Sequence, residues 1–263
     1  MKNHVTPLII TFNEIDNIAR TIEALKWAKR IVVVDSGSTD GTLEFLALDS
    51  RISVYSRTFT TFAEQCNFGL SHIETEWVLS LDADYVLSDP LVEELSILQM
   101  DKAIAGYRTR FVYKIFGQQL RGSLYPPRIV LYQASKGRYV DQGHGHALKL
   151  DGDIADLRNV TFHDDRKPLR RWLDSQMKYA RSEAAYLREA DRKNLKPQDK
   201  LRLWLWPAPF LVAIYTLLIK GAVFDGVPGW HYTLQRLLAE ILLSLELTDR
   251  WMSQKNANTN KTD

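Results

Sequence analysis

The sequence Ile31-Val32-Val33-Val34-Asp35-Ser36-Gly37-Ser38-Thr39-Asp40-Gly41-Thr42 joins a buried-strand pattern to a loop pattern. Four consecutive β-branched residues predict a strand buried on both faces, as in a parallel sheet. The small and polar residues that follow predict a loop, and Thr42 is a plausible helix start. Asp35 therefore lies at the carboxyl end of a buried strand, where open α/β sheets bind ligands. The alternative is an aspartate that caps its own turn.

Strand and helix patterns alternate on both sides of this stretch. Strands are predicted at 4–12, 52–55 and 76–81, and helices after Asp16, which can cap the first of them, and at 62–73. This alternation predicts an α/β fold with a mostly parallel sheet flanked by helices. The chain contains no G-x-G-x-x-G and no G-x-x-x-x-G-K-[ST] motif, which argues against the usual dinucleotide fold and against a P-loop.

Asp82-Ala83-Asp84 follows the apolar strand at 76–81. Two carboxylates two residues apart repel each other, and a hard divalent cation relieves this repulsion by taking their oxygens as ligands. Mg²⁺ commonly binds one or two protein carboxylates and completes its shell with substrate phosphates. A D-x-D pattern alone is weak, but here it ends a strand and is paired with Asp35 at another strand end.

These motifs resemble those of the inverting glycosyltransferases of family 2, which have the GT-A fold, and especially the subgroup that adds sugars to the lipopolysaccharide core. The resemblance rests on Thr11-Phe12-Asn13-Glu14, on residues 33–42 and on residues 77–84, and it covers about residues 5–185. It implies a nucleotide-diphosphate sugar donor. It also implies a nucleotide-sugar site formed by Thr11, Asn13, Glu14, Asp35, Ser36, Gly37, Asp40, Asp82 and Ala83.

Within that site, the resemblance gives separate roles to the carboxylates. Asp35 would hydrogen-bond the base, Asp82 would face the ribose, and Asp84 would bind the metal on the diphosphate, with Asp82 as a second metal ligand. His163 ends a late strand pattern at 160–163 and would be a third metal ligand or a structural histidine. The cofactor is expected to be Mg²⁺ or Mn²⁺, of which Mn²⁺ tolerates nitrogen better.

The segment Tyr139 to Leu148 holds three candidate catalytic residues, Asp141, His144 and His146, beside two glycines, a composition unlike that of a core strand. Strands predicted at 105–112 and 128–132 precede it on the expected acceptor side. In the core-sugar subgroup a His-Glu pair stands near this segment, and His146 takes the position of the glutamate. An inverting transfer needs one base, and an imidazole is suited to that role because its pKa lies near working pH. Asp141 is the alternative base, and a purely structural glycine turn is the alternative for the whole segment.

The C-terminal third of the chain is basic and then apolar. Residues 166–202 hold 12 Lys/Arg and 5 Asp/Glu, a net charge of +7 in a chain of net charge +2, so the rest carries −5. Residues 203–219 follow as 17 residues without a charge, and an amphipathic helix is predicted at 230–251. A basic segment beside an apolar one favours an anionic membrane surface over nucleic acid. A buried helical hairpin or a homo-oligomer interface would have the same composition.

These patterns divide the 263 residues into a glycosyltransferase domain at 1–165, a helical region at 166–253 and a disordered tail at 254–263. Hydrophobic residues make up 45% of the chain, enough for a sizeable core. The single cysteine, Cys66, excludes an intrachain disulfide and favours a reducing compartment, and no signal peptide is recognised.

The interpretation is a metal-dependent inverting glycosyltransferase at the cytoplasmic face of an inner membrane, peripheral or re-entrant. Its expected acceptor is a lipid-linked glycan, most simply the lipopolysaccharide core, and no nucleic-acid partner is expected. The alternatives are a polyprenyl-phosphate sugar synthase of similar fold, whose phosphate acceptor needs no base, and a non-catalytic membrane scaffold.

Overall fold

The computed structural model describes residues 4–142, 145–193 and 195–259. It divides into two compact units, which are considered separately. Unit 1 comprises residues 1–119 and 123–167, and unit 2 comprises residues 120–122 and 168–263. The boundary expected at residue 165 lies close to this division, while the separate roles given to the two regions stay a prediction.

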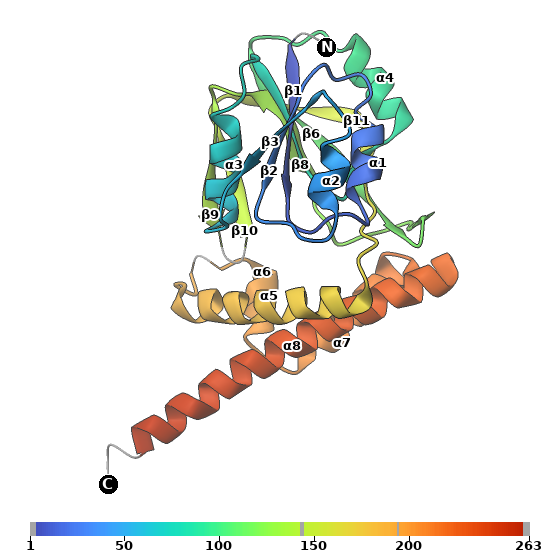
Figure 1. The fold of residues 1–263 in the computed structure, drawn as a ribbon. Helices are drawn as coiled ribbons and strands as arrows, with labels where there is room; N and C mark the ends of the chain where they lie inside the picture. The colour runs from blue at the N-terminus through green and yellow to red at the C-terminus, as the bar shows by residue number, and fades with distance from the viewer. Residues whose placement is uncertain (1–3, 143–144, 194, 260–263) are drawn as a thin grey trace. The chain divides into compact units, whose positions relative to one another are not determined.

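Unit 1 is built on one large mixed sheet (Figure 1). Its first half runs in the order β3 (Ile52–Ser56), β2 (Ile31–Asp35), β1 (Val5–Thr11) and β4 (Trp77–Asp82), with every pair parallel. Next come β8 (Arg128–Gln133), β6 (Ile104–Ile115), β11 (Asp153–His163) and β5 (Tyr85–Leu87). Among these only β6 and β11 pair in parallel, and β7 (Gln118–Gln119) pairs with β6. The predicted α/β class is confirmed, and its parallel part is the N-terminal half.

The two faces of the sheet are covered by different elements (Figure 1). One face packs against α1 (Ile18–Glu23), α2 (Thr42–Leu46) and α4 (Asp89–Ile97). The other packs against α3 (Phe62–Leu70) and the hairpin of β9 (Gly137–Gln142) and β10 (Gly145–Leu150). Val33 belongs to the first core and Val32 and Val34 to the second, so β2 is buried on both faces as predicted.

Several elements depart from the sequence-based expectation. Asn17, not Asp16, occupies the N-cap of α1, and its side chain makes no capping hydrogen bond. The short β5 and helix α4 follow Asp84 directly, where no element was expected. The glycine-containing segment at 139–148 is largely a β-hairpin, because its residues pair in register from Gly137↔Leu150 to Gln142↔Gly145.

Unit 2 is helical. It contains α5 (Leu169–Glu189), α6 (Pro197–Arg202), α7 (Pro207–Ile214), a π-helical turn (Tyr215–Ile219), a 3₁₀ turn (Ala222–Asp225) and α8 (Gly226–Thr259). Its core joins Ala180, Ala184 and Leu187 of α5 to Leu243 and Leu247 of α8. Helix α8 is longer than the helix predicted at 230–251. It includes residues 254–259, which were expected to be disordered.

Within the described residues of unit 2, no single helix has the length and apolarity of a membrane span. The segments 207–219 and 222–254 meet that criterion only as a pair, and they are bent by 67°. Large apolar side chains remain exposed in this region, among them Trp204 at 68%, Trp206 at 75% and Phe224 at 70%.

Candidate functional site

The carboxyl ends of β1, β2 and β4 lie at one edge of the sheet, as the sequence predicts. Thr11 pairs with Asp35 and Ile10 pairs with Asp82, so parallel pairing brings these strand ends together. Thr11 is buried, and its hydroxyl oxygen has no hydrogen-bond partner among the described residues. Ala83 is also buried, and its carbonyl accepts a hydrogen bond of 2.7 Å from the Thr21 hydroxyl, which fixes the end of β4 to α1.

Asp35 caps its own turn. One carboxylate oxygen accepts hydrogen bonds from the backbone N–H groups of Gly37 and Ser38, at 2.8 and 2.9 Å. The other accepts from the Ser38 hydroxyl at 2.5 Å, and the residue is fully buried. These contacts match the turn-capping alternative. The contact with a nucleotide base stays a prediction and would require this carboxylate to become accessible.

The loops after β1 and β2 are hydrogen-bonded to each other. Asn13, with a positive φ of 56°, donates its backbone N–H to the Ser38 hydroxyl at 2.7 Å and accepts from the Thr39 N–H at 2.7 Å. Asp40 accepts from the backbone N–H of Ile15 at 3.3 Å and from the Thr42 hydroxyl at 2.5 Å. The Ser36 hydroxyl accepts from the Gln65 side chain at 2.9 Å. These predicted site residues therefore hold the loops in place.

Asp84 is the centre of a buried charge cluster. Its Oδ2 lies 3.2 Å from His163 Nε2 and 3.8 Å from Lys167 Nζ. Lys167 also contacts Glu14 at 2.8 Å and Asp165 at 3.5 Å. The predicted Glu14, Asp84 and His163 are thus brought together around a lysine that the sequence analysis did not single out.

Hydrogen bonds from α1 hold the segment that carries Lys167. The Asn17 amide donates to Asp165 at 2.9 Å and accepts from the Arg166 N–H at 2.9 Å. Asp164 is buried, its backbone N–H donates to the Asp84 carbonyl at 3.1 Å, and its carboxylate lies 3.4 Å from Arg20. Lys167 is therefore directed into the cluster by the backbone that follows β11.

Burial and charge act in opposite directions on this cluster. Burial raises the pKa of Glu14 to about 7, with a further rise from Asp84, although Lys167 and Asn17 act to lower it. Burial alone would raise the pKa of Asp84, but His163 and Lys167 together hold it well below its ordinary value. Burial would lower the pKa of Lys167, but Asp84, Glu14 and Asp165 raise it above its usual value.

The hairpin brings two of the three predicted base candidates together. His146 of β10 pairs with Asp141 of β9, and its ring lies 5.7 Å from that of Phe62 and 5.2 Å from that of Tyr139. Burial lowers the pKa of His146, while the carboxylates of Asp82 and Asp141 act to raise it. The Tyr139 ring beside His146 reaches β4, because its hydroxyl donates to the Ser80 hydroxyl at 2.8 Å, two residues before Asp82. His144 lies outside the described residues.

A comparison with protein families identifies the family of this chain. The model of glycosyl transferase family 2 matches residues 7–139, which include most of β1, all of β2 and β4, and the carboxylates Asp35, Asp82 and Asp84. The chain belongs to glycosyl transferase family 2. The family predicted from the sequence motifs is thereby confirmed.

Curated relatives of this glycosyltransferase match part of its length. It is 29% identical over 162 residues to the lipopolysaccharide core biosynthesis glycosyltransferase LpsC of Rhizobium meliloti (strain 1021), a match that covers 59% of this chain and 60% of LpsC. An uncharacterized glycosyltransferase of Rickettsia felis is 34% identical over 95 residues, which are 36% of this chain and 33% of that protein. The chain thus spans less than two thirds of these relatives.

Solved structures of two glycosyltransferases are similar at low identity. The S. aureus TarS 1-349 complex with UDP-GlcNAc is 14% identical, with a TM-score of 0.48, covering 90% of this chain and 81% of that one. Glucosyl-3-phosphoglycerate synthase from Mycobacterium tuberculosis, in complex with Mn²⁺, UDP and phosphoglyceric acid, is 17% identical with a TM-score of 0.45. That match covers 71% of this chain and 78% of the synthase.

The residues fit a divalent cation at Asp84 but do not form the predicted three-residue ligand set. Among the described residues, no group of three His, Cys, Asp or Glu side chains converges on a metal position. His163 instead contacts Asp84 directly. Asp84 Oδ1 is buried without a hydrogen-bond partner in the described part of the chain, as a ligand oxygen awaiting a hard cation would be. Asp84 would thus hold the ion, with the remaining ligands supplied from outside the protein.

Sequence reasoning missed two cations of the site, Lys167 and Arg128. Lys167 was counted among the basic residues that were assigned to a membrane surface, although its position soon after His163 placed it near a strand end. Arg128 begins β8, and its guanidinium carbon lies 4.8 Å from the centre of the Tyr125 ring. No pattern in the sequence indicated that β8 pairs with β4 in antiparallel fashion, the pairing that directs Arg128 toward the end of β4.

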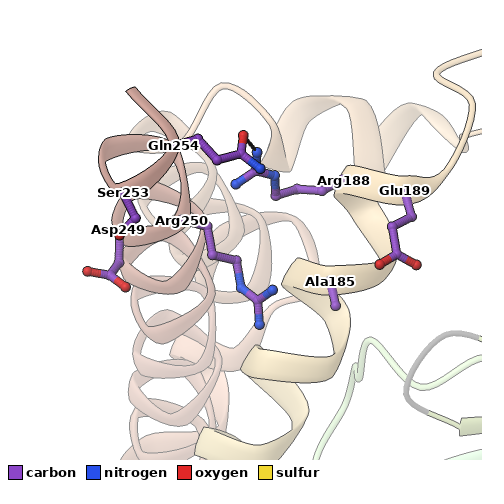
Figure 2. A pocket seen from close by; sticks show the side chains of 7 residues that line it. All are labelled: Ala185, Arg188, Glu189, Asp249, Arg250, Ser253 and Gln254. Carbon is purple, nitrogen blue, oxygen red and sulfur yellow. Dashed lines mark hydrogen bonds between the residues drawn. The ribbon is translucent and has the colours of Figure 1, made fainter. Parts of the chain in front are cut away.

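A separate cavity of about 410 Å³ lies within unit 2, between α5 and α8 (Figure 2). Arg188 and Gln254 hydrogen-bond across its edge. It contains none of the predicted site residues. The residues that line it are Ala185, Arg188, Glu189, Asp249, Arg250, Ser253 and Gln254.

Proposed function

We propose that this glycosyltransferase transfers a sugar, with inversion, from a nucleoside-diphosphate donor to a hydroxyl group of a lipid-linked glycan, and that it requires a divalent cation. The observation that carries the proposal is the joint placement of the Asp82–Asp84 strand end and His146. The first offers a binding site for a charged leaving group, and the second offers a base on the hairpin, which Tyr139 joins to β4 two residues before Asp82. Such a transfer needs both functions.

The donor side is formed by the carboxylate cluster. A divalent ion at this position would stabilise the negative charge that develops on the departing diphosphate. Asp84 supplies the buried oxygen for that ion, and Lys167 and His163 orient the carboxylate from its other oxygen. Asp82 is the second carboxylate of the motif and is only partly buried. It would therefore be reachable by the donor.

The acceptor side is formed by the hairpin. Burial favours the neutral imidazole of His146, which is the form that accepts a proton from a hydroxyl group. Asp141, its partner in the strand register, is exposed and is the alternative base. The relative LpsC is named for lipopolysaccharide core biosynthesis, which supports a glycan of that class as the acceptor.

The exposed apolar residues of unit 2 support a reaction that takes place at a membrane surface. Trp204, Trp206, Ile219, Phe224 and Val227 are all at least 68% exposed, and the preceding segment 166–202 has a net charge of +7. Exposed tryptophans together with positive charge are the features of segments that lie at anionic membrane interfaces. We place the chain at the cytoplasmic face of the inner membrane, where these residues would bring it to a lipid-linked acceptor. A homo-oligomer would cover the same apolar residues.

Donor binding and donor hydrolysis across a panel of nucleotide sugars test the proposal. Each donor is measured with Mn²⁺, with Mg²⁺ and with EDTA, for the wild type, Asp84→Asn and the control Glu93→Gln, which changes an exposed acid on α4. The expected result is metal-dependent selection of one donor that Asp84→Asn abolishes and Glu93→Gln preserves. Folded wild-type protein that binds no donor would refute the transferase and favour the scaffold.

The same assay with acceptor separates the two transferase alternatives. A polyprenyl-phosphate sugar synthase has an acceptor that is already an anion, so it needs no base. Transfer that survives both His146→Ala and Asp141→Ala would therefore favour the synthase. Transfer that is lost with one of these substitutions, while donor binding is kept, would identify the base.

A further inference from the structure

Arg128 lies at the same sheet edge as the Asp82–Asp84 motif, on the strand that adjoins β4. Strands β4 and β8 pair in antiparallel fashion, with Trp77 opposite Gln133 and Leu79 opposite Leu131. The amino-terminal end of β8, where Arg128 stands, therefore runs toward the carboxyl end of β4. Burial would lower the pKa of Arg128, but Tyr85, Tyr125 and Asp82 raise it above its ordinary value.

Two other largely buried cations of the described chain, Lys167 and Arg202, have carboxylate partners, and Arg128 differs from them. Lys167 contacts three carboxylates in unit 1, and Arg202 contacts Glu240, Glu183 and Asp199 in unit 2. Arg128 is only partly exposed, yet its guanidinium makes no hydrogen bond or ion pair with any residue that the structure describes. A cation held in such a place costs free energy unless an anion compensates it.

An aromatic cluster holds the Arg128 guanidinium in place. The guanidinium lies over the Tyr125 ring, and the hydroxyl of Tyr125 hydrogen-bonds that of Tyr85. The ring of His163 lies 5.1 Å from Tyr125 and 4.3 Å from Tyr113, so the cluster adjoins the Asp84 carboxylate. Aromatic rings leave the edge of a guanidinium free to donate hydrogen bonds while its face is packed.

We propose that Arg128 binds an oxyanion of the substrate, a phosphate or a carboxylate group, at the edge of the sheet between Asp82 and Tyr125. The planar fork of arginine N–H groups matches both oxyanions, and it pairs with them through two parallel hydrogen bonds. Under the proposed function, on which this step rests, the oxyanion comes from one of two sources. One is the diphosphate of the donor, and the other is an acidic group on the acceptor glycan.

Calorimetric titration of the full chain in EDTA tests the proposal without turnover. Pyrophosphate represents the donor diphosphate, and glucuronate represents an acidic sugar. The variants are Arg128→Gln, Arg128→Lys and the control Arg110→Gln, which changes an exposed arginine on the neighbouring strand β6. Circular dichroism establishes that each variant is folded.

Arg128→Gln should weaken the binding of at least one probe about tenfold or more, the effect of losing hydrogen bonds to a charged group. Arg128→Lys should weaken it by a smaller factor, because the charge remains and the fork is lost, and Arg110→Gln should leave it unchanged. Loss for pyrophosphate assigns the anion to the donor, and loss for glucuronate alone assigns it to the acceptor. If Arg128→Gln does not fold, Arg128→Lys carries the comparison.

The proposal is overturned if the wild type binds neither probe, or if the Arg128 variants bind both as tightly as the wild type. These outcomes are distinct from a failure of the proposed function. A chain that binds an anion through Arg128 but selects no nucleotide sugar would keep the subsite and lose the transferase donor assignment. A chain that selects a donor, with anion binding independent of Arg128, would do the reverse.

Discussion

Lys167→Met is the substitution that most directly tests the buried charge cluster. The Lys167 ammonium lies 2.8 Å from Glu14, 3.5 Å from Asp165 and 3.8 Å from Asp84. At an effective dielectric constant of about 20, each contact is worth roughly 4–6 kcal/mol of attraction before desolvation is subtracted. Removing one partner of a buried ion pair typically destabilises a protein by about 3–5 kcal/mol, because the remaining charges stay buried.

We expect the variant to lose about 3 kcal/mol of unfolding free energy in EDTA, the lower end of that range, because Glu14 can bind a proton to relieve part of the charge. Mn²⁺ should then restore stability. An ion present at 100 times its dissociation constant contributes about 2.7 kcal/mol to the folded state. The gain should be larger in the variant than in the wild type, because Lys167 no longer neutralises Asp84.

The assay is urea denaturation monitored by circular dichroism, with EDTA and with MnCl₂, at a pH near 8. Arg166→Met is the matched control, because this neighbouring arginine contacts Asp164 at 2.8 Å but makes no contact with Asp84 among the ion pairs of the described residues. It should lose about 1 kcal/mol or less and respond to Mn²⁺ as the wild type does. The reasoning is refuted if Lys167→Met is as stable as the wild type in EDTA, or if Mn²⁺ stabilises both proteins equally.

Four further predictions follow from the same contacts. Burial raises the pKa of Glu14 to about 7, so the folded state binds this proton more tightly than the unfolded state, and the free energy of unfolding falls as the pH rises. Between pH 5 and 8, urea denaturation should show the wild type losing about 2–3 kcal/mol more unfolding free energy than Glu14→Gln. An equal dependence of stability on pH in the two proteins would contradict this. His146→Ala should lower kcat by about 10²–10⁴-fold. Because burial lowers the pKa of His146, the acid limb of the wild-type pH profile of kcat should lie below pH 6.5. An unchanged pH profile in the variant would exclude His146 as the base. Asp35→Ala should cost about 2–4 kcal/mol of thermal stability even without ligand, since it removes an acceptor of three hydrogen bonds; a smaller loss would argue against the capping role. Replacing Trp204 and Trp206 with serine should reduce sedimentation with anionic vesicles, whereas retention equal to the wild type would point to another membrane contact.

The fold of the N-terminal half could be predicted because its signals are local. The β-branched run of β2 is long enough to identify a strand buried on both faces, and each acidic residue that ends β2 and β4 marks the same edge. The hairpin at 137–150 was missed because its histidines and glycines have loop composition. Its place against α3 is set by the long-range hydrogen bonds between Asn67 and Tyr139. Composition does not carry that contact.

The charge cluster around Asp84 could be predicted from the sequence only in part. Glu14, Asp84 and His163 were each identified by type and position, but their partner Lys167 lies far from Glu14 in the chain and belongs to a segment whose net charge suggested another role. Asp35 was identified for its position, yet its hydrogen bonds are made within three residues. A carboxylate at a strand end can serve its own turn or a ligand, and only the geometry distinguishes the two.

The hydrogen bonds between Asn13 and the loop after β2 have a consequence for molecular recognition. A molecule that arrives at this edge meets two loops that are already ordered with respect to each other, because Asn13 donates to one residue of the second loop and accepts from the next. The entropy of ordering these loops is therefore lost during folding and does not have to be lost again during binding. Selectivity at this edge would then arise from shape that is fixed in advance by the hydrogen bonds of Asn13.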